Sequence, residues 1–136
     1  MRLSFVVAGR PVSLQARRRE VLRDWKETVR RAAPPMPSGA VSIPVVVWIV
    51  CFLEADFQID VDNVAKPILD AIKDGAVLAD DALVVDLTLR KRTLGATLTV
   101  ENPPVEVAAA LDAGDPFVHI EVEAASAPNL LRYGSP

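Results

Sequence analysis

The longest apolar run of the sequence, from Ile43 to Leu53, constrains the fold more than any other feature. The run is 11 residues long, contains one proline, Pro44, and is rich in valine and isoleucine. Such β-branched residues favour strands, and a membrane-spanning helix needs about 20 apolar residues. We therefore predict a long buried strand over residues 41–53. Pro44 indicates either an edge position in the sheet or a bulge near the start of the strand.

Length and composition predict one folded domain without a membrane span. The chain has 136 residues, of which 51% are hydrophobic and 24% charged, which suits a single core. Cys51 is the one cysteine, so neither an internal disulfide nor a Cys/His zinc cluster can form, and we expect a small buried side chain. The apolar stretch at the N-terminus is too short for a signal peptide. These features predict a cytoplasmic protein.

Periodicity predicts the other elements around this strand. Residues 17–33 repeat apolar side chains at helical spacing, and Asp62 or Asn63 is placed to cap a second helix that ends before Gly75. A third helix is expected at 104–113, and further strands at 3–8, 83–91, 97–101 and 117–122. We predict an α+β fold in which two main helices pack on a mixed sheet of about four strands. Residues 1–123 would form the domain and residues 124–136 a loose C-terminal tail.

Charge is distributed unevenly along the chain. The net charge is −3, yet residues 1–33 carry nine Arg or Lys and three acidic residues, whereas residues 54–81 carry eight acidic residues and two Lys. Phosphate backbones are bound by basic surfaces, and divalent cations by clustered carboxylates. Ordinary solvated helix faces and loops remain the alternative explanation.

The acidic segment contains carboxylates at a spacing that suits a metal ion. Asp60 and Asp62 lie two residues apart, so on an extended chain both side chains point the same way. They repel each other unless a cation or a shared proton lies between them. Oxygen ligands of this kind suit Mg²⁺ or Mn²⁺. Asp80 or Asp81, after the intervening helix, would supply a third carboxylate.

Lys66 follows Asp62 by one helical turn and would share its face. A lysine beside a bound metal stabilises a scissile phosphate or orients the attacking water. Simpler interpretations stay open, in which Asp62 and Asn63 form a cap favoured by the helix dipole and Asp62 and Lys66 form a plain ion pair. For Asp70 a salt bridge to Lys66 is favoured over metal binding, and for the lone His119 a structural or exposed position is favoured over catalysis.

The central motif resembles the signature of the RusA family of Holliday junction resolvases. In this chain the motif reads Asp60-x-Asp62-Asn63-x-x-Lys66-x-x-x-Asp70, followed by Asp80-Asp81 and a Val-rich strand. The Gly9-Arg10-Pro11 turn and the arginines at 17–19 resemble the opening of that family. The resemblance spans about residues 3–123, and one departure is Gln58-Ile59, where family members carry basic residues.

The resemblance implies a homodimeric endonuclease that resolves four-way DNA junctions by paired nicks in recombination and repair. Carried over by position, Asp60, Asp62 and Asp81 would hold Mg²⁺ or, in its place, Mn²⁺, and Lys66 would be the catalytic lysine. The basic residues expected to contact the branched DNA are Arg17, Arg18, Arg19, Arg90 and Lys91. Two other functions remain open: a non-catalytic nucleic-acid-binding relative, and a metal-dependent phosphoesterase acting on a small substrate.

Overall fold

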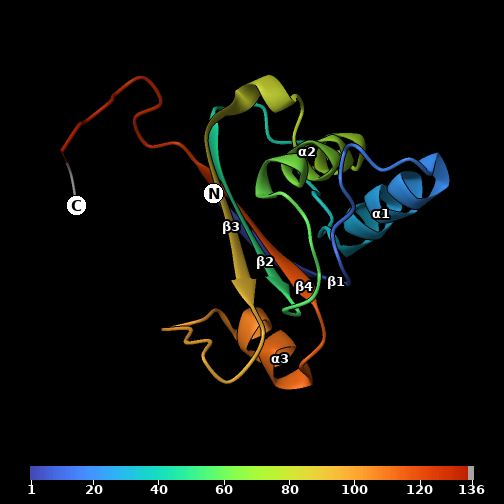
Figure 1. Cartoon of the computed structure of the whole chain (residues 1–136). Coiled ribbons are helices and arrows are strands. Elements are labelled where there is room, and N and C mark those ends of the chain that lie inside the picture. Colours follow the sequence, from blue (N-terminus) through green and yellow to red (C-terminus); the bar gives the residue numbers. More distant parts are fainter. Residues whose placement is uncertain (135–136) are drawn as a thin grey trace.

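Strand β2 (Val45–Leu53) lies inside a four-stranded mixed sheet whose order is β1-β4-β2-β3. The structure is a computed structural model that describes residues 1–134 (Figure 1). Strand β4 (Phe117–Ala124) pairs antiparallel with both β2 and β1 (Arg2–Ala8), whereas β3 (Val84–Thr93) runs parallel to β2. The predicted α+β fold with a mixed sheet is therefore confirmed.

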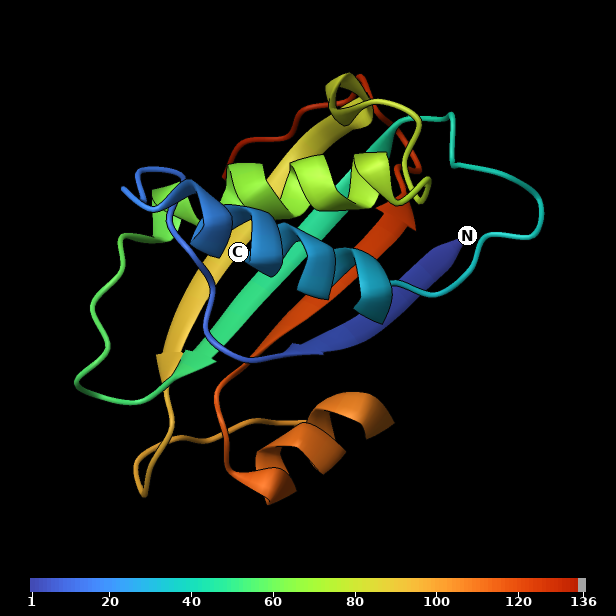
Figure 2. The same cartoon turned by 90° about the vertical axis from the view of Figure 1, so that its right-hand side faces the viewer.

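Two helices, α1 (Arg19–Ala32) and α2 (Ala65–Asp74), cover one face of the sheet (Figure 2). Helix α1 buries Leu22, Trp25 and Val29, and α2 buries Ile68 and Ile72. Helix α2 belongs to the crossover from β2 to β3, which two parallel strands require. The main core therefore lies between these helices and the sheet, as the two-helix prediction anticipated.

The third helix, α3 (Val105–Ala113), packs at one end of the opposite face of the sheet. Its Val107 joins a second apolar cluster with Val50, Phe52 and Phe117. The rings of Phe52 and Phe117 are stacked with centroids 4.5 Å apart. Because α3 covers only this end, much of the second face has no helix over it within residues 1–134.

The strand predicted at 97–101 is wrong, because these residues form a turn and an irregular segment. Leu98 and Val100 pack against the cluster of Val50, Phe52, Phe117 and Val107. Their alternation therefore reflects burial at the base of α3 and not pairing within the sheet. After β3, the Leu94 amide donates a backbone hydrogen bond to the Leu53 carbonyl of β2, at 2.8 Å. The chain then leaves the edge of the sheet.

Of the two explanations for Pro44, the edge position is wrong and the irregularity near the strand start is confirmed. Strand β2 lies between β4 and β3, and its pairing with β3 shifts register between Val45 and Val46. Val84 is the partner of Val45 and Asp86 that of Val46, which leaves Val85 outside the pairing. Val85 is 41% exposed, whereas Leu89 further along β3 is partly buried against the main core.

The start of α2 also differs from the prediction. A short 3₁₀ turn, η1 (Val61–Asn63), precedes the helix, whose cap residue is Val64 and has no capping side-chain hydrogen bond. Asp62 and Asn63 therefore do not cap α2, and that interpretation is wrong. Instead, the backbone carbonyl of Asn63 accepts a hydrogen bond from the Leu14 amide at 3.1 Å, which docks the N-terminal loop against η1.

Cys51 is buried as expected, and burial raises the pKa of its thiol to about 12. In the part of the chain from 1 to 134, no helix is both long and apolar enough to cross a membrane. Residues 125–134 form neither helix nor strand, and Leu131 and Tyr133 are largely exposed. The division between domain and tail at residue 123 stays a prediction.

Candidate active site

Lys66, in the first turn of α2, lies between two carboxylates. Its Nζ is 2.8 Å from Oδ2 of Asp81, which begins the 3₁₀ turn η2 (Asp81–Leu83), and 2.9 Å from Oδ1 of Asp70. The other oxygen of Asp70 lies 3.4 Å from Nζ of Lys26 on α1. Charges therefore alternate across α1, α2 and η2, and the salt bridge expected between Asp70 and Lys66 is confirmed.

The two carboxylates hold Lys66 in its charged form. The hydrogen bond with Asp81 and then that with Asp70 raise the pKa of Lys66 above its ordinary value. Reciprocally, the hydrogen bond from Lys66 lowers the pKa of Asp81. Lys66 is exposed and the two carboxylates are partly exposed, and ion pairs near the surface contribute little to folding stability. Their main consequence is that the Lys66 ammonium has a defined orientation.

The neighbouring residues Asp80 and Asp81 have separate roles. Oδ1 of Asp80 accepts a hydrogen bond from the Ala82 amide at 3.0 Å and so caps η2. Asp81, one residue later, contacts Lys66 instead. Asp80 therefore orders the backbone of this turn, while Asp81 presents its carboxylate to the lysine.

A groove of about 550 Å³ lies beside Asp60. Its polar lining comes from the N-terminal loop, the segment before α2 and strand β3, and includes Arg10, Ser13, Gln15, Asp60, Asn63 and Lys91. Lys91 donates a hydrogen bond from Nζ to the Ile59 carbonyl at 2.9 Å, which ties the segment before Asp60 to the sheet. A concave surface with several convergent polar groups is typical of a binding site.

The three predicted metal ligands are of a suitable type but do not form one cluster. Asp60 lines the groove, Asp62 is exposed in η1, and Asp81 contacts Lys66. Within residues 1–134, no three His, Cys, Asp or Glu side chains are grouped so that they could hold a metal ion. Carboxylate oxygens are the donors that Mg²⁺ and Mn²⁺ prefer, so the ligand set fits such an ion by chemistry and stays a prediction in its geometry. No ion pair joins Asp62 and Lys66 among the described residues.

The basic residues predicted to contact DNA are separated by the structure. Arg17, Arg18 and Arg19 are exposed where the N-terminal loop meets α1. In β3, successive side chains point to opposite faces. Lys91 therefore lines the groove beside Asp60, whereas the Arg90 guanidinium lies over the Trp48 ring on the other face, 4.3 Å from its centroid.

Two basic residues at this site were missed by the sequence analysis. Arg10 forms an ion pair with Glu54 and lies over the Phe57 ring, 5.6 Å from its centroid. The Gly9-Arg10-Pro11 sequence was a usable signal for a tight turn that presents Arg10. In the structure Gly9 has a φ of +110°, a conformation that favours glycine. Lys26 carried no comparable signal, because its contact with Asp70 depends on how α1 packs against α2.

His119 has the structural position that the sequence favoured. It is 7% exposed, and its Nε2 lies 2.8 Å from Oγ of Ser4 on β1. Ser4 also donates a hydrogen bond to Oε1 of Glu106 on α3. His119 lines a pocket on the sheet face that α1 and α2 do not cover, whereas Lys66 belongs to α2, so the two residues do not belong to one site.

The comparisons with known proteins agree with this motif. The sequence model of the family Endodeoxyribonuclease RusA matches residues 7–108, which include the whole segment from Asp60 to Asp81. No curated protein is similar enough to match. The family match covers well over half of the chain and identifies a hydrolase that cuts DNA at crossover junctions, and nucleases of this family are metal-dependent. This chain therefore belongs to the RusA family of endodeoxyribonucleases.

Proposed function

We propose that this enzyme is a Mg²⁺-dependent, structure-selective endonuclease that resolves four-way DNA junctions by paired nicks in recombination and repair. The observation that carries the proposal is the position of Lys66. Its ammonium is exposed, is held by Asp70 and Asp81, and lies within the segment that the family model matches. An oriented cation of this kind is suited to stabilise charge that develops on a scissile phosphate.

Asp60, Asp62 and Asp81 are the proposed ligands of the divalent cation, which would supply an activated water and neutralise phosphate charge. Two observations support the choice of Asp81 over Asp80. The Asp80 carboxylate is engaged by the Ala82 amide, and the Asp81 carboxylate is directed toward Lys66. Mn²⁺ has similar ligand preferences and is expected to substitute for Mg²⁺.

Lys66 is proposed to act as an electrostatic stabiliser and not as a general base. Because Asp81 and Asp70 raise the pKa of Lys66, the side chain remains protonated at neutral pH. A protonated amine can donate hydrogen bonds to a phosphate oxygen but cannot accept a proton from water. Asp70 would then keep the Lys66 ammonium in place when the Asp81 carboxylate turns from Lys66 to the divalent cation.

The branched substrate is proposed to contact Arg17, Arg18, Arg19 and Lys91 on the side of the groove, with Arg90 reached across the edge of β3. A four-way junction offers two equivalent strands for cleavage, so a two-fold symmetric homodimer would match its symmetry. We place the catalytic domain within residues 1–123 and expect the enzyme to act in the cytoplasm.

A gel assay tests this function directly. A synthetic four-way junction is incubated with the protein and Mg²⁺, with a linear duplex of the same sequence as the substrate control. Asp62→Asn serves as the inactive variant. Asp56→Asn is the matched control, because Asp56 is an exposed aspartate of the same loop outside the motif. We expect symmetric nicks in the junction alone, which Asp62→Asn loses and Asp56→Asn retains.

The other outcomes separate the competing functions. Junction binding without cleavage by the unmodified protein would favour a non-catalytic relative of the same fold. Neither binding nor cleavage would point to a different phosphoester substrate, and the DNA proposal would then be abandoned. Cleavage of the linear duplex at the same rate would contradict structure selectivity while leaving a nuclease.

A further inference from the structure

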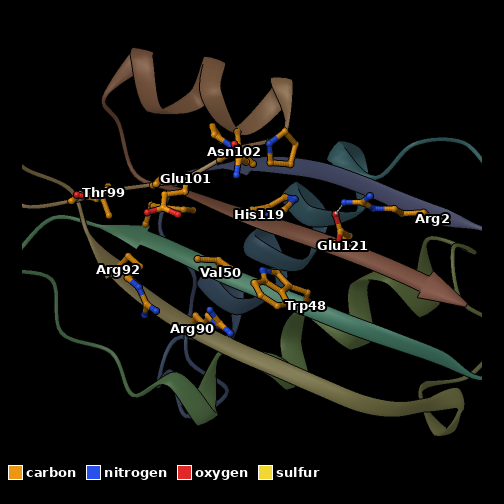
Figure 3. Close-up of a pocket in the computed structure, with 16 residues that line it drawn as sticks. Arg2, Trp48, Val50, Arg90, Arg92, Thr99, Glu101, Asn102, His119 and Glu121 are labelled. Atoms are coloured by element: carbon orange, nitrogen blue, oxygen red, sulfur yellow. Dashed lines mark hydrogen bonds and ion pairs between the residues drawn. The ribbon is translucent and has the colours of Figure 1, made fainter. Parts of the chain in front are cut away.

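The face of the sheet that α1 and α2 leave uncovered contains a second pocket, of about 420 Å³ (Figure 3). Trp48 and Val50 of β2 and His119 of β4 contribute to its floor, Arg90 and Arg92 lie on the β3 side, and the loop before α3 closes it opposite. This volume falls within the range of about 300–1,000 Å³ that small-molecule sites occupy. The pocket is separate from the groove that contains Asp60, which lies on the helix-covered side.

One side of this pocket combines an aromatic ring with two cations. Trp48 is half-buried, and the Arg90 guanidinium carbon lies 4.3 Å from its ring centroid. Arg92 is two residues further along β3 and therefore shares the same face. Neither Arg90 nor Arg92 takes part in an ion pair within residues 1–134, and both are exposed. Arg92 donates one hydrogen bond from its guanidinium to the Lys91 carbonyl, at 3.0 Å, and its other N–H groups, like those of Arg90, are able to bind an anion.

On the other side of the pocket, Arg2, His119 and Glu121 are already engaged by neighbouring side chains. Arg2 forms an ion pair with Glu121 at 2.9 Å, and His119 contacts Ser4, which donates to Glu106. A ligand anion would accordingly be directed to the β3 side of the pocket. Thr99, Glu101 and Asn102 at the opposite rim offer donors and acceptors of the kind that read the edge of a nucleobase.

We propose that this pocket binds one nucleotide of an unpaired DNA strand. The base stacks on the Arg90 guanidinium, which itself lies over the Trp48 ring. The remaining N–H groups of Arg90 and those of Arg92 bind the adjoining phosphate. Aromatic rings and arginine planes bind the bases of single strands by stacking, and arginine binds phosphate through paired hydrogen bonds. A free nucleotide has the same two groups, so the chemistry alone admits both sources.

Strand β3 connects this pocket to the candidate active site. Lys91 lies between Arg90 and Arg92 in sequence but lines the groove beside Asp60, because side chains alternate along the strand. Among the described residues, strand β3 is also the edge strand of the sheet, next to β2. A DNA strand that crosses this edge would meet basic groups on both faces. The inference thus extends the proposed function to a second subsite for a strand that leaves the junction.

Fluorescence of Trp48 tests the proposal without any cleavage step. The protein is titrated in EDTA with an oligomer of eight thymidine nucleotides, and separately with thymidine monophosphate. The second tryptophan, Trp25, is 5% exposed in the main core and is expected to stay silent. We expect the oligomer to quench emission, and Trp48→Phe to remove the quenching while it keeps the affinity measured by anisotropy of a labelled oligomer.

Substitutions that remove stacking or charge are expected to weaken binding. Trp48→Leu should lower oligomer affinity about tenfold or more, the effect of losing one stacked base. Arg92→Gln should also weaken binding, whereas Lys73→Gln on α2, which removes an exposed charge on the other side of the sheet, should not. Retained affinity in Trp48→Leu, with a native circular dichroism spectrum, would overturn the stacking proposal.

Each remaining result has a defined meaning. Quenching by the oligomer alone assigns the site to a strand, and quenching by both probes supports a nucleotide site that also accepts free nucleotides. No quenching by either probe would overturn the inference. A change of Trp48 emission with protein concentration alone would also overturn it, because a second copy would then cover this face. The junction assay is independent, so cleavage without quenching would leave the proposed function standing.

Discussion

Nζ of Lys66 lies 2.8 Å from Oδ2 of Asp81, fifteen residues further along the chain. This contact joins the first turn of α2 to the turn that precedes β3. Asp70, one helical turn after Lys66, contacts the same ammonium at 2.9 Å. Lys66 is therefore oriented by one contact within its own helix and one contact that only the fold produces. A variant without the lysine side chain tests whether this orientation matters for cleavage.

Replacing Lys66 by alanine should abolish cleavage while it leaves DNA binding nearly unchanged. Removal of a single group that stabilises transition-state charge costs roughly 10²- to 10³-fold in rate, whereas one exposed charge among many contributes little to affinity. Single-turnover cleavage of a four-way junction and gel-shift titration measure the two quantities. Lys73→Ala, on the same helix, is the matched control and should retain cleavage. An equal loss of binding and cleavage would make Lys66 a phosphate contact and not a catalytic residue.

Addition of Mg²⁺ should raise the melting temperature, and Asp62→Asn should remove this increase. A ligand that binds only the folded state at a hundred times its Kd stabilises it by about 2.7 kcal/mol. Calorimetry with and without Mg²⁺ gives the shift, which does not depend on catalysis. Asp74→Asn controls for loss of one exposed carboxylate and should keep the shift. If Asp62→Asn responds to Mg²⁺ as the unmodified protein does, the proposed ligand set is wrong.

Changing Arg17, Arg18 and Arg19 together to alanine should weaken binding to every DNA sequence tested. Phosphate contacts release counterions, so the logarithm of the binding constant falls with the logarithm of salt concentration by about 0.9 per neutralised phosphate. Loss of these side chains should flatten that slope. Binding titrations at several salt concentrations provide the measurement, and an unchanged slope would remove this cluster from the DNA surface.

His119 should make the protein less stable as the solution is acidified. Burial lowers the pKa of His119 below its ordinary value of 6.5 and outweighs Glu121 and Glu106, which raise it, while Arg2 also lowers it. The Ser4 hydroxyl is a further polar neighbour, 2.8 Å from Nε2 of His119. The unfolded chain then binds the proton more readily, so the full contribution is present above 6.5 and is lost as the pH falls through that value toward the folded pKa.

Because the chain has one histidine, the effect can be assigned. Urea unfolding at pH values of about 7.5 and 5.5, the window in which histidine titrates, should show lower stability at the acidic end. His119→Gln should reduce this difference, and the imidazole pKa can be read from its proton resonances. A measured pKa above 6.5 would reverse the sign of the prediction.

Local sequence patterns predicted burial correctly where the spacing of the apolar residues had a single structural cause. The helical spacing of Leu22, Trp25 and Val29 and the lone Cys51 each predicted burial that the structure confirms. The buried strand predicted over residues 41–53 is confirmed from Val45 to Leu53, whereas Ile43 lies before the strand and is 48% exposed. Residues 97–101 had an equally regular pattern for a different reason. Leu98 and Val100 are partly buried against the cluster beneath α3, and an alternating pattern cannot distinguish that burial from pairing in a sheet.

The sequence by itself determined the identities and spacing of the acidic motif from Asp60 to Asp81, the presence of Lys66 within it, and the membership of the chain in a nuclease family. The pairing of Lys66 with Asp81 and the contact of Lys91 with the segment before Asp60 were decided by the tertiary structure. The physical reason is that chemistry is encoded residue by residue. Which carboxylate reaches which cation depends instead on how α2 and β3 pack, and thus on contacts between residues distant in sequence.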